Sequence, residues 1–213
     1  MRLSELFREV EFDGSIKNDA DINLVTDDSR LVRPGSLFVC IRHRSFDGHT
    51  AALDALASGA AAVVTQDRLG LENELHVADS RSTYARLCAA LCNHPERKLR
   101  MIGVTGTNGK TTVTTLIRNI LSDSGTKTLL TGTVCNRLGD ENLPSGLTTP
   151  KPPELYSLLS RAVSQRCKAC VMEASSQALA QGRLEGIDFD AAVFTNITRD
   201  HLDYHGTFEN YIS

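Results

Sequence analysis

The sequence predicts an α/β protein built from two successive units, and two observations lead to that prediction. Short apolar runs typical of buried strands alternate with stretches of helical periodicity along most of the 213 residues. A polar segment that contains a proline, residues 94–98, interrupts this alternation. We therefore expect one domain over residues 1–93 and a second over residues 99–213. Strands that alternate with helices usually form parallel sheets covered on both faces, so each domain should contain such a sheet.

The first domain has a strand–helix–strand order. Residues 37–41 and 60–65 are apolar runs that predict buried strands, with a helical stretch between them. Residues 80–92 have the period of an amphipathic helix, which Asp79 or Ser80 can cap. The apolar stripe of that helix would be formed by Tyr84, Leu87, Cys88, Leu91 and Cys92. This order indicates a Rossmann-like α/β domain.

The second domain repeats the alternation. Strands are expected over residues 99–104, 128–131, 169–172 and 191–195, and helices over 111–122 and 153–164. The buried face of the first of these helices would consist of Val113, Leu116, Ile117, Ile120 and Leu121. The last residues, 208–213, predict the start of a helix that has no terminating residue, so we expect the second domain to be incomplete.

Composition excludes several classes of protein. The 23 Lys and Arg against 26 Asp and Glu give a net charge of −3, without the basic excess of a nucleic-acid-binding protein. No apolar run approaches the roughly 18 residues of a membrane-spanning helix, and the N-terminus does not read as an export signal. We expect a cytoplasmic monomer with no nucleic-acid partner and no membrane insertion. Cys167 and Cys170 lack further ligands at metal-site spacing, so we expect them to be buried as small apolar side chains.

Residues 103–112, Gly-Val-Thr-Gly-Thr-Asn-Gly-Lys-Thr-Thr, follow a predicted strand and open a predicted helix. In that context the backbone N–H groups at the helix start can bind phosphate. Lys110 would add positive charge, and the Thr111 hydroxyl could bind Mg²⁺. Val104 stands where the usual pattern has its first glycine, yet a plain strand–turn–helix corner would not explain Lys-Thr-Thr. The second domain is therefore predicted as a partial P-loop ATPase-type domain with a mainly parallel sheet. The expected ATP-binding residues are Gly106, Thr107, Asn108, Gly109, Lys110, Thr111 and Thr112.

This loop resembles the ATP loop of the Mur ligases and of the related folylpolyglutamate synthases, which form amide bonds at the expense of ATP. Residues 200–206, Asp-His-Leu-Asp-Tyr-His-Gly, are similar to a signature of the Mur ligases. Asp28-Ser29-Arg30 and Asp47-Gly48-His49 resemble the N-terminal domain of the family members that add a diamino acid. Folylpolyglutamate synthases lack such a UDP-binding domain, so the resemblance favours a Mur ligase.

The resemblance implies a ligase of peptidoglycan precursor synthesis. It would join a diamino acid, meso-diaminopimelate or L-lysine, to UDP-MurNAc-L-Ala-D-Glu through an acyl phosphate, with ATP and Mg²⁺. The implied catalytic residues are Lys110, Glu173 and His201, and the implied metal ligands are Thr111, Glu173 and His201. The implied substrate-binding residues are Ser29, Arg44, Ser45 and Phe46 for the UDP part, and Thr148, Thr149, Ser175, Gln181 and Arg183 for the muramoyl-peptide part. His43 and Leu147 replace a glycine and an asparagine that are usual in the family.

Other functions stay open on the sequence. The chain could be a different Mur ligase, or a non-catalytic module that binds a nucleotide or the UDP-linked substrate. Because the second domain reads as incomplete, we expect a truncated form that binds substrates without completing the ligation by itself.

Overall fold

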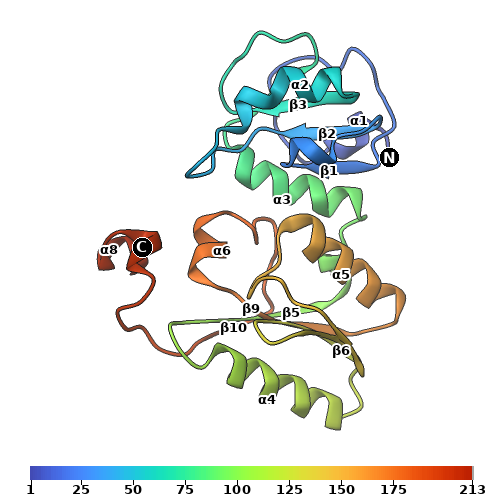
Figure 1. Cartoon of the computed structure of the whole chain (residues 1–213). Helices are drawn as coiled ribbons and strands as arrows, with labels where there is room; N and C mark the ends of the chain where they lie inside the picture. Colours follow the sequence, from blue (N-terminus) through green and yellow to red (C-terminus); the bar gives the residue numbers. More distant parts are fainter. Residues whose placement is uncertain (213) are drawn as a thin grey trace. The chain divides into compact units, whose positions relative to one another are not determined.

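The computed structural model describes residues 1–212, which form two compact units, one over residues 1–93 and one from residue 94 onward (Figure 1). Each unit is a sheet with helices packed on it. Among the described residues, no helix has the length and apolar character needed to cross a bilayer.

The first unit contains a four-stranded parallel sheet of order β1-β2-β3-β4. Its strands are β1 (Leu24–Thr26), β2 (Ser36–Val39), β3 (Ala60–Thr65) and β4 (Glu74–His76). Its helices are α1 (Leu3–Leu6), α2 (Ala52–Ala57) and α3 (Ser80–Leu91), with short 3₁₀ turns η1 (Ser29–Leu31) and η2 (Gly48–Ala51). Helix α2 packs against β3 and α3 packs against β1. All residues of β2 are buried, as expected for an inner strand of a parallel sheet.

The second unit contains a six-stranded sheet of order β10-β5-β9-β6-β7-β8, in which the first four strands are parallel. The strands are β5 (Arg100–Thr105), β6 (Thr128–Thr131), β7 (Asn136–Leu138), β8 (Glu141–Leu143), β9 (Ala169–Glu173) and β10 (Ala191–Phe194). The helical elements are η3 (Pro95–Lys98), α4 (Lys110–Asp123), α5 (Pro152–Ser164), α6 (Ser176–Ala180), α7 (Leu202–His205) and α8 (Phe208–Ile212). Figure 1 shows α4 on one face of this sheet and α5 on the other.

Most expected elements are confirmed. The predicted strands and long helices occur within one or two residues of the expected bounds, and a helix does begin at Phe208. Asp79 caps α3 by accepting hydrogen bonds from the N–H groups of Arg81 and Ser82. Cys167 and Cys170 are free and buried, and burial raises the pKa of both thiols. The apolar role predicted for these two cysteines is therefore confirmed.

The buried face predicted for α4 is wrong in part. Leu116 and Ile120 are 55% and 67% exposed, while Thr114 and Arg118 are the buried residues of the helix. Hydrogen bonds satisfy part of their polar groups: the Thr114 hydroxyl donates to the Lys110 carbonyl and Arg118 Nη2 donates to the carbonyl of Gly139, whereas Arg118 Nε is buried without a partner among residues 1–212. Hydrogen bonding therefore allows a threonine and an arginine to occupy positions that a hydrophobicity pattern assigns to apolar side chains.

Candidate functional site

The polar segments singled out in the second unit leave the sheet at the same edge. Strands β5, β9, β6 and β10 run parallel, so their carboxyl ends lie side by side. The glycine-rich loop follows β5, Glu173 ends β9, and the segment 195–201 follows β10. Loops that are distant in sequence thus meet at the edge where parallel sheets usually bind ligands.

The loop of residues 106–109 presents free backbone donors to this edge. Gly109, with φ 86°, precedes α4 without a side-chain cap, so its lack of a Cβ permits this backbone conformation. Within residues 1–212, no hydrogen bond engages the N–H groups of Lys110, Thr111 or Thr112. These donors and the positive end of the 14-residue helix are arranged as a site that can bind an anion.

The side chain of Lys110 lies back over the same loop. Its Nζ donates to the carbonyl oxygens of Gly106, at 2.7 Å, and Thr107, at 3.0 Å. The ammonium group is thereby held beside the free N–H groups. This arrangement can present a positive charge and several N–H donors to one bound phosphate.

The segment after β10 supports the loop from the other side. Asn196 accepts a hydrogen bond from the N–H of Asn108 through Oδ1, at 3.1 Å, and from the N–H of Thr107 through its carbonyl, at 2.9 Å. The Thr195 hydroxyl donates to the Asn108 carbonyl at 2.7 Å. The Thr107 hydroxyl accepts from the N–H of Thr198 at 2.9 Å. Thr107 and Asn108, predicted to bind ATP, are therefore also the residues through which the loop is braced.

Glu173 lies at the end of β9 and is 1% exposed. Both of its carboxylate oxygens accept hydrogen bonds from Thr133, Oε1 from the backbone N–H and Oε2 from the hydroxyl, each at 3.0 Å. The hydroxyl of Thr148 lies 3.0 Å from that of Thr133. Since a threonine hydroxyl has one proton and the carboxylate accepts that of Thr133, the Thr148 hydroxyl must donate to Thr133. Thr148, a predicted substrate-binding residue, is thus linked through Thr133 to Glu173, a predicted metal ligand.

The predicted metal ligands are brought together only in part. Thr111 and Glu173 line one cavity of about 230 Å³, whereas His201 is not among its lining residues. The His201 ring instead lies near Asp200, with Nδ1 3.8 Å from Oδ1. Across residues 1–212 there is no group of three or more His, Cys, Asp and Glu side chains able to hold a metal ion.

The oxygen donors in that cavity nevertheless suit Mg²⁺, which commonly uses one or two carboxylates together with phosphate oxygens and water. A Cβ added to Gly132 would lie 2.3 Å from Glu173 Oε1, so this glycine leaves space beside the carboxylate. In the described chain, the Thr111 hydroxyl makes no hydrogen bond. The residues present therefore fit a magnesium ion held by Glu173 and Thr111, and a contribution from His201 stays a prediction.

The predicted muramoyl-peptide residues form one hydrogen-bonded network. The Thr149 hydroxyl donates to the Glu173 carbonyl and accepts from the N–H of Ser175, at 2.7 and 3.0 Å. Arg183 donates through Nη1 to the Thr149 carbonyl and through Nε and Nη2 to Gln181 Oε1. Ser175 also caps α6 by accepting from the N–H of Ala178. These residues are brought together as predicted, and each has a structural hydrogen bond as well.

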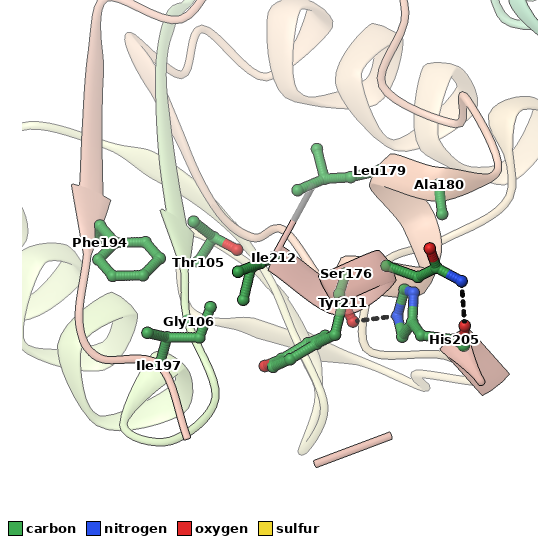
Figure 2. A pocket seen from close by; sticks show the side chains of 11 residues that line it. Thr105, Gly106, Ser176, Leu179, Ala180, Phe194, Ile197, His205, Tyr211 and Ile212 are labelled. Carbon is green, nitrogen blue, oxygen red and sulfur yellow. Dashed lines mark hydrogen bonds between the residues drawn. The ribbon is translucent and has the colours of Figure 1, made fainter. Parts of the chain in front are cut away.

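A second cavity, of about 450 Å³, lies beside the glycine-rich loop (Figure 2). It extends from Gly106 on the loop to Ser176 at the start of α6. The His205 ring reaches this cavity, and Figure 2 shows it hydrogen-bonded to Ser176. Its Nε2 lies 3.0 Å from the Ser176 hydroxyl. The glycine-rich loop and the Ser175-to-Arg183 stretch therefore border a common space.

In the first unit, the predicted UDP-binding residues follow β1 and β2, which are neighbours in the parallel sheet. Ser29 is half-buried in η1, which Asp28 caps by accepting from the N–H of Arg30. Arg44, Ser45 and Phe46 are exposed after β2, and the Phe46 ring offers an uncovered apolar surface. Both stretches thus leave the same sheet edge with surface available to a ligand.

The base of the 44–46 loop is held by Asp47 and His49. Burial alone would raise the pKa of Asp47, but hydrogen bonds from the His49 backbone and ring and from Arg42 lower that pKa to about 2. The His49 ring places Nδ1 2.6 Å from Asp47 and accepts at Nε2 from the N–H of Gln66. His49 is consequently a structural residue with both ring nitrogens engaged.

Comparison with protein families agrees with this geometry. Residues 104–213 match the Mur ligase middle domain, and residues 21–93 match the model described as Mur ligase family, catalytic domain. The chain belongs to the Mur ligase family. The predicted α/β class is confirmed by the structure and by a solved UDP-N-acetylmuramoyl-L-alanyl-D-glutamate–2,6-diaminopimelate ligase. That structure superposes with a TM-score of 0.80 at 33% identity and covers 99% of this chain and 43% of its own length.

Curated Mur ligases are similar over most of the chain. One from Geobacillus kaustophilus is 46% identical over 192 residues, or 90% of this chain and 39% of the relative. One from Phocaeicola vulgatus is 39% identical over 217 aligned residues, or 100% of this chain and 45% of the relative. Both are named UDP-N-acetylmuramoyl-L-alanyl-D-glutamate–2,6-diaminopimelate ligase. The chain spans less than half the length of these Mur ligases.

Several residues that shape this Mur ligase site escaped the sequence prediction. Thr133 holds the Glu173 carboxylate by hydrogen bonds, and Gly132 leaves space for it. Thr195 and Asn196 brace the glycine-rich loop. The position of Asn196 just after an apolar strand could have indicated that it lies at the sheet edge near the loop. Gly132 and Thr133 carry no signal, since their role depends on contact with Glu173, 40 residues away.

Gly132→Ala tests whether the space beside Glu173 serves a metal ion. The added methyl group should displace the carboxylate and weaken ATP binding in the presence of Mg²⁺ by about tenfold, the scale on which displaced metal-site residues act. Binding measured calorimetrically with EDTA in place of Mg²⁺ should not change. Gly146→Ala is the matched control, because a Cβ at Gly146 meets no atom within 4 Å. Equal losses with and without Mg²⁺ would contradict the assignment.

Proposed function

We propose that this chain provides the UDP-substrate-binding and ATP-binding parts of a peptidoglycan precursor ligase. The reaction is the ATP-dependent joining of a diamino acid to UDP-MurNAc-L-Ala-D-Glu. Relatives of 46% and 39% identity carry the name of a 2,6-diaminopimelate ligase, which favours diaminopimelate over lysine. The reaction is proposed to take place in the cytoplasm. The observation that carries the proposal is the common sheet edge shared by the phosphate loop, Glu173 and the Thr149-to-Arg183 network.

ATP is proposed to bind with its phosphates on the free N–H groups of residues 110–112. In the first half-reaction, a carboxylate oxygen of the D-Glu residue attacks the γ-phosphorus, giving an acyl phosphate and releasing ADP. The amine of the diamino acid then attacks the acyl carbon, phosphate leaves, and an amide forms. Lys110 and the loop N–H groups would stabilise negative charge on the phosphoryl group during transfer.

Magnesium is proposed to be held by the Glu173 carboxylate and the Thr111 hydroxyl. When bound, Mg²⁺ would neutralise part of the negative charge on the phosphate groups. Thr133 orients the Glu173 carboxylate through two hydrogen bonds, which fixes where its remaining lone pairs point. His201 is proposed as a further ligand on the family resemblance alone.

The D-Glu carboxylate is proposed to enter the cavity between Gly106 and Ser176. That cavity borders the phosphate loop on one side and α6 on the other, so a carboxylate there would face the γ-phosphate. The Arg183 guanidinium, whose position Gln181 and Thr149 fix, would recognise the peptide or its carboxylates. The nucleotide end of the substrate would be held by Ser29 and residues 44–46 of the first unit.

Calorimetric titration of the 213-residue chain tests this assignment. We expect saturable binding of ATP with Mg²⁺, and binding of UDP-MurNAc-L-Ala-D-Glu that is tighter than binding of UDP-MurNAc-L-Ala or of the UDP-MurNAc-tripeptide. Tighter binding of one of the latter two would indicate a different Mur ligase. Binding of ATP with no binding of any muramoyl nucleotide would reduce the chain to a nucleotide-binding module and overturn the proposal.

A further inference from the structure

A side-chain contact joins the two stretches expected to hold the uridine diphosphate part of the substrate. Residues 28–30 follow β1, and residues 44–46 follow β2. The residue that precedes each stretch takes part in the contact: His43 Nε2 lies 3.3 Å from Asp27 Oδ2. This pair therefore fixes the separation of the two loops at the place where the nucleotide would lie between them.

Asp27 is well suited to act as the fixed partner. Its side chain is only 10% exposed, and its second oxygen, Oδ1, accepts a hydrogen bond from the Tyr84 hydroxyl at 3.1 Å. Burial raises the pKa of Tyr84, so the phenol stays protonated and acts as the donor at neutral pH. The carboxylate is thus anchored to α3, with Oδ2 directed at His43.

His43 transmits its position to the loop that follows it. Its backbone N–H donates to the Phe46 carbonyl at 2.8 Å, which closes the turn over residues 43–46. His43 is not among the residues with positive φ, so a side chain is accommodated here without backbone strain. Moving the imidazole therefore moves the turn that carries Arg44, Ser45 and Phe46.

We propose that Asp27 and His43 form a positioning pair that sets the geometry of the UDP-binding loops, and that the charge on His43 tunes the affinity for the UDP-linked substrate. The inference rests on the proposed function of the first unit. A protonated imidazole attracts the Asp27 carboxylate more strongly than a neutral one, so the loops should be held most firmly at mildly acidic pH.

Charged and titratable groups face this pair from its own loop, from α3 and from the loop after β1. Arg42 and Arg44 flank it on its own loop, and Arg81 of α3 donates to the Arg42 carbonyl. Asp47 has its pKa lowered to about 2, while burial raises the pKa of Tyr84 and of Cys88 on α3. Asp28 adds a further carboxylate from the loop after β1, where it pairs with Arg30. His49 is a further imidazole in this unit, and both of its ring nitrogens are engaged. Replacing His43 separates the effect of His43 on binding from that of His49.

The test is calorimetric binding of UDP-MurNAc-L-Ala-D-Glu to the full chain at about pH 6 and about pH 8, a range in which an imidazole titrates and the diphosphate diester does not. His43→Ala should weaken binding about five- to tenfold at the lower pH, the value of a lost charge-assisted hydrogen bond, and should remove the pH dependence. His43→Arg should retain the affinity and also lose the pH dependence. This rescue would not occur if His43 only filled space.

Asp27→Asn should weaken binding to a similar extent, and the Asp27→Asn/His43→Ala double variant should be no weaker than either single variant. His76→Ala is the control, because the His76 ring contacts the Gln66 carbonyl rather than Asp27 or the turn of residues 43–46. Thermal unfolding of each variant checks that it is folded. The His43 side chain is 38% exposed, so its replacement should be tolerated.

The inference would be overturned if the wild type bound the UDP-linked substrate and the variants bound it with affinities within twofold of the wild type. It would also be overturned if His43→Ala left the pH dependence of binding unchanged. Absence of wild-type binding would instead overturn the proposed function.

Discussion

Replacing Lys110 by alanine should lower the affinity of the chain for ATP and Mg²⁺ by roughly 10- to 100-fold, the range for losing hydrogen bonds to a charged group. The Lys110 ammonium lies over the loop, 2.7 and 3.0 Å from two loop carbonyls, beside three backbone N–H groups that have no partner among residues 1–212. Its loss would leave those N–H groups but remove the positive charge. ATP affinity measured by calorimetry checks the prediction.

Lys168→Ala provides the matched control for this substitution. Lys168 is exposed and immediately precedes β9, so it lies at the opposite end of that strand from Glu173. Its hydrogen bonds to Lys127 and Arg100 use backbone atoms that alanine retains. The control should bind ATP as the wild type does. Unchanged ATP affinity in Lys110→Ala, or an equal loss in both variants, would refute the assignment of Lys110 to the phosphate site.

The order of elements was predictable because it depends on local pattern. Strands β2, β3, β6 and β9 are mostly or fully buried and carry continuous or near-continuous apolar runs, as inner parallel strands do. Strand β5 and the exposed edge strand β10 are also largely apolar. The β7–β8 hairpin was missed since Asn136–Leu138 and Glu141–Leu143 are short and mostly polar. Such strands are defined by pairing with β6 and with each other, which the pattern of one segment does not reveal.

The rotation of α4 shows how a site can override hydrophobic periodicity. The helix must begin at Lys110 with its N–H groups directed at the sheet edge, which fixes the rows of side chains that follow. Thr114 and Arg118 then occupy the inward row, one turn apart, and the Thr114 hydroxyl and Arg118 Nη2 donate to backbone carbonyls. Apolar residues elsewhere on the helix, such as Ile120, are left exposed. A periodicity argument alone has no access to this constraint.

The residues of the candidate site came from the family resemblance, and their contacts with one another did not follow from it. The sequence identified Thr149, Ser175, Gln181 and Arg183, and the structure joins them in one network. The bonds that reach Thr149 could not be inferred because they join segments 26 and 34 residues apart in the sequence. The same reason explains why Thr133 was missed although it binds both oxygens of Glu173.

Gly106→Ala should cause the largest combined loss of stability and ATP binding in the second unit. Gly106 has a φ of 128°, which a residue with a Cβ adopts only with strain. A Cβ at this position would lie 2.2 Å from Thr195 Oγ1 and 2.7 Å from the Asn196 carbonyl oxygen. We expect a destabilisation of about 2–4 kcal/mol from strain and steric overlap together, measured by denaturant unfolding.

The overlap should also abolish tight ATP binding, because the atoms displaced are those that brace the loop. Thr195 and Asn196 hold the carbonyl and the N–H of Asn108, so moving them shifts the backbone donors away from the phosphate. Gly125→Ala separates strain from overlap, since Gly125 has a φ of 80° but a Cβ there meets no atom within 4 Å. That control should lose about 1 kcal/mol of stability and keep its ATP affinity. If both glycine variants bound ATP equally well, the packing of segment 195–196 against the loop would not be what shapes the phosphate site.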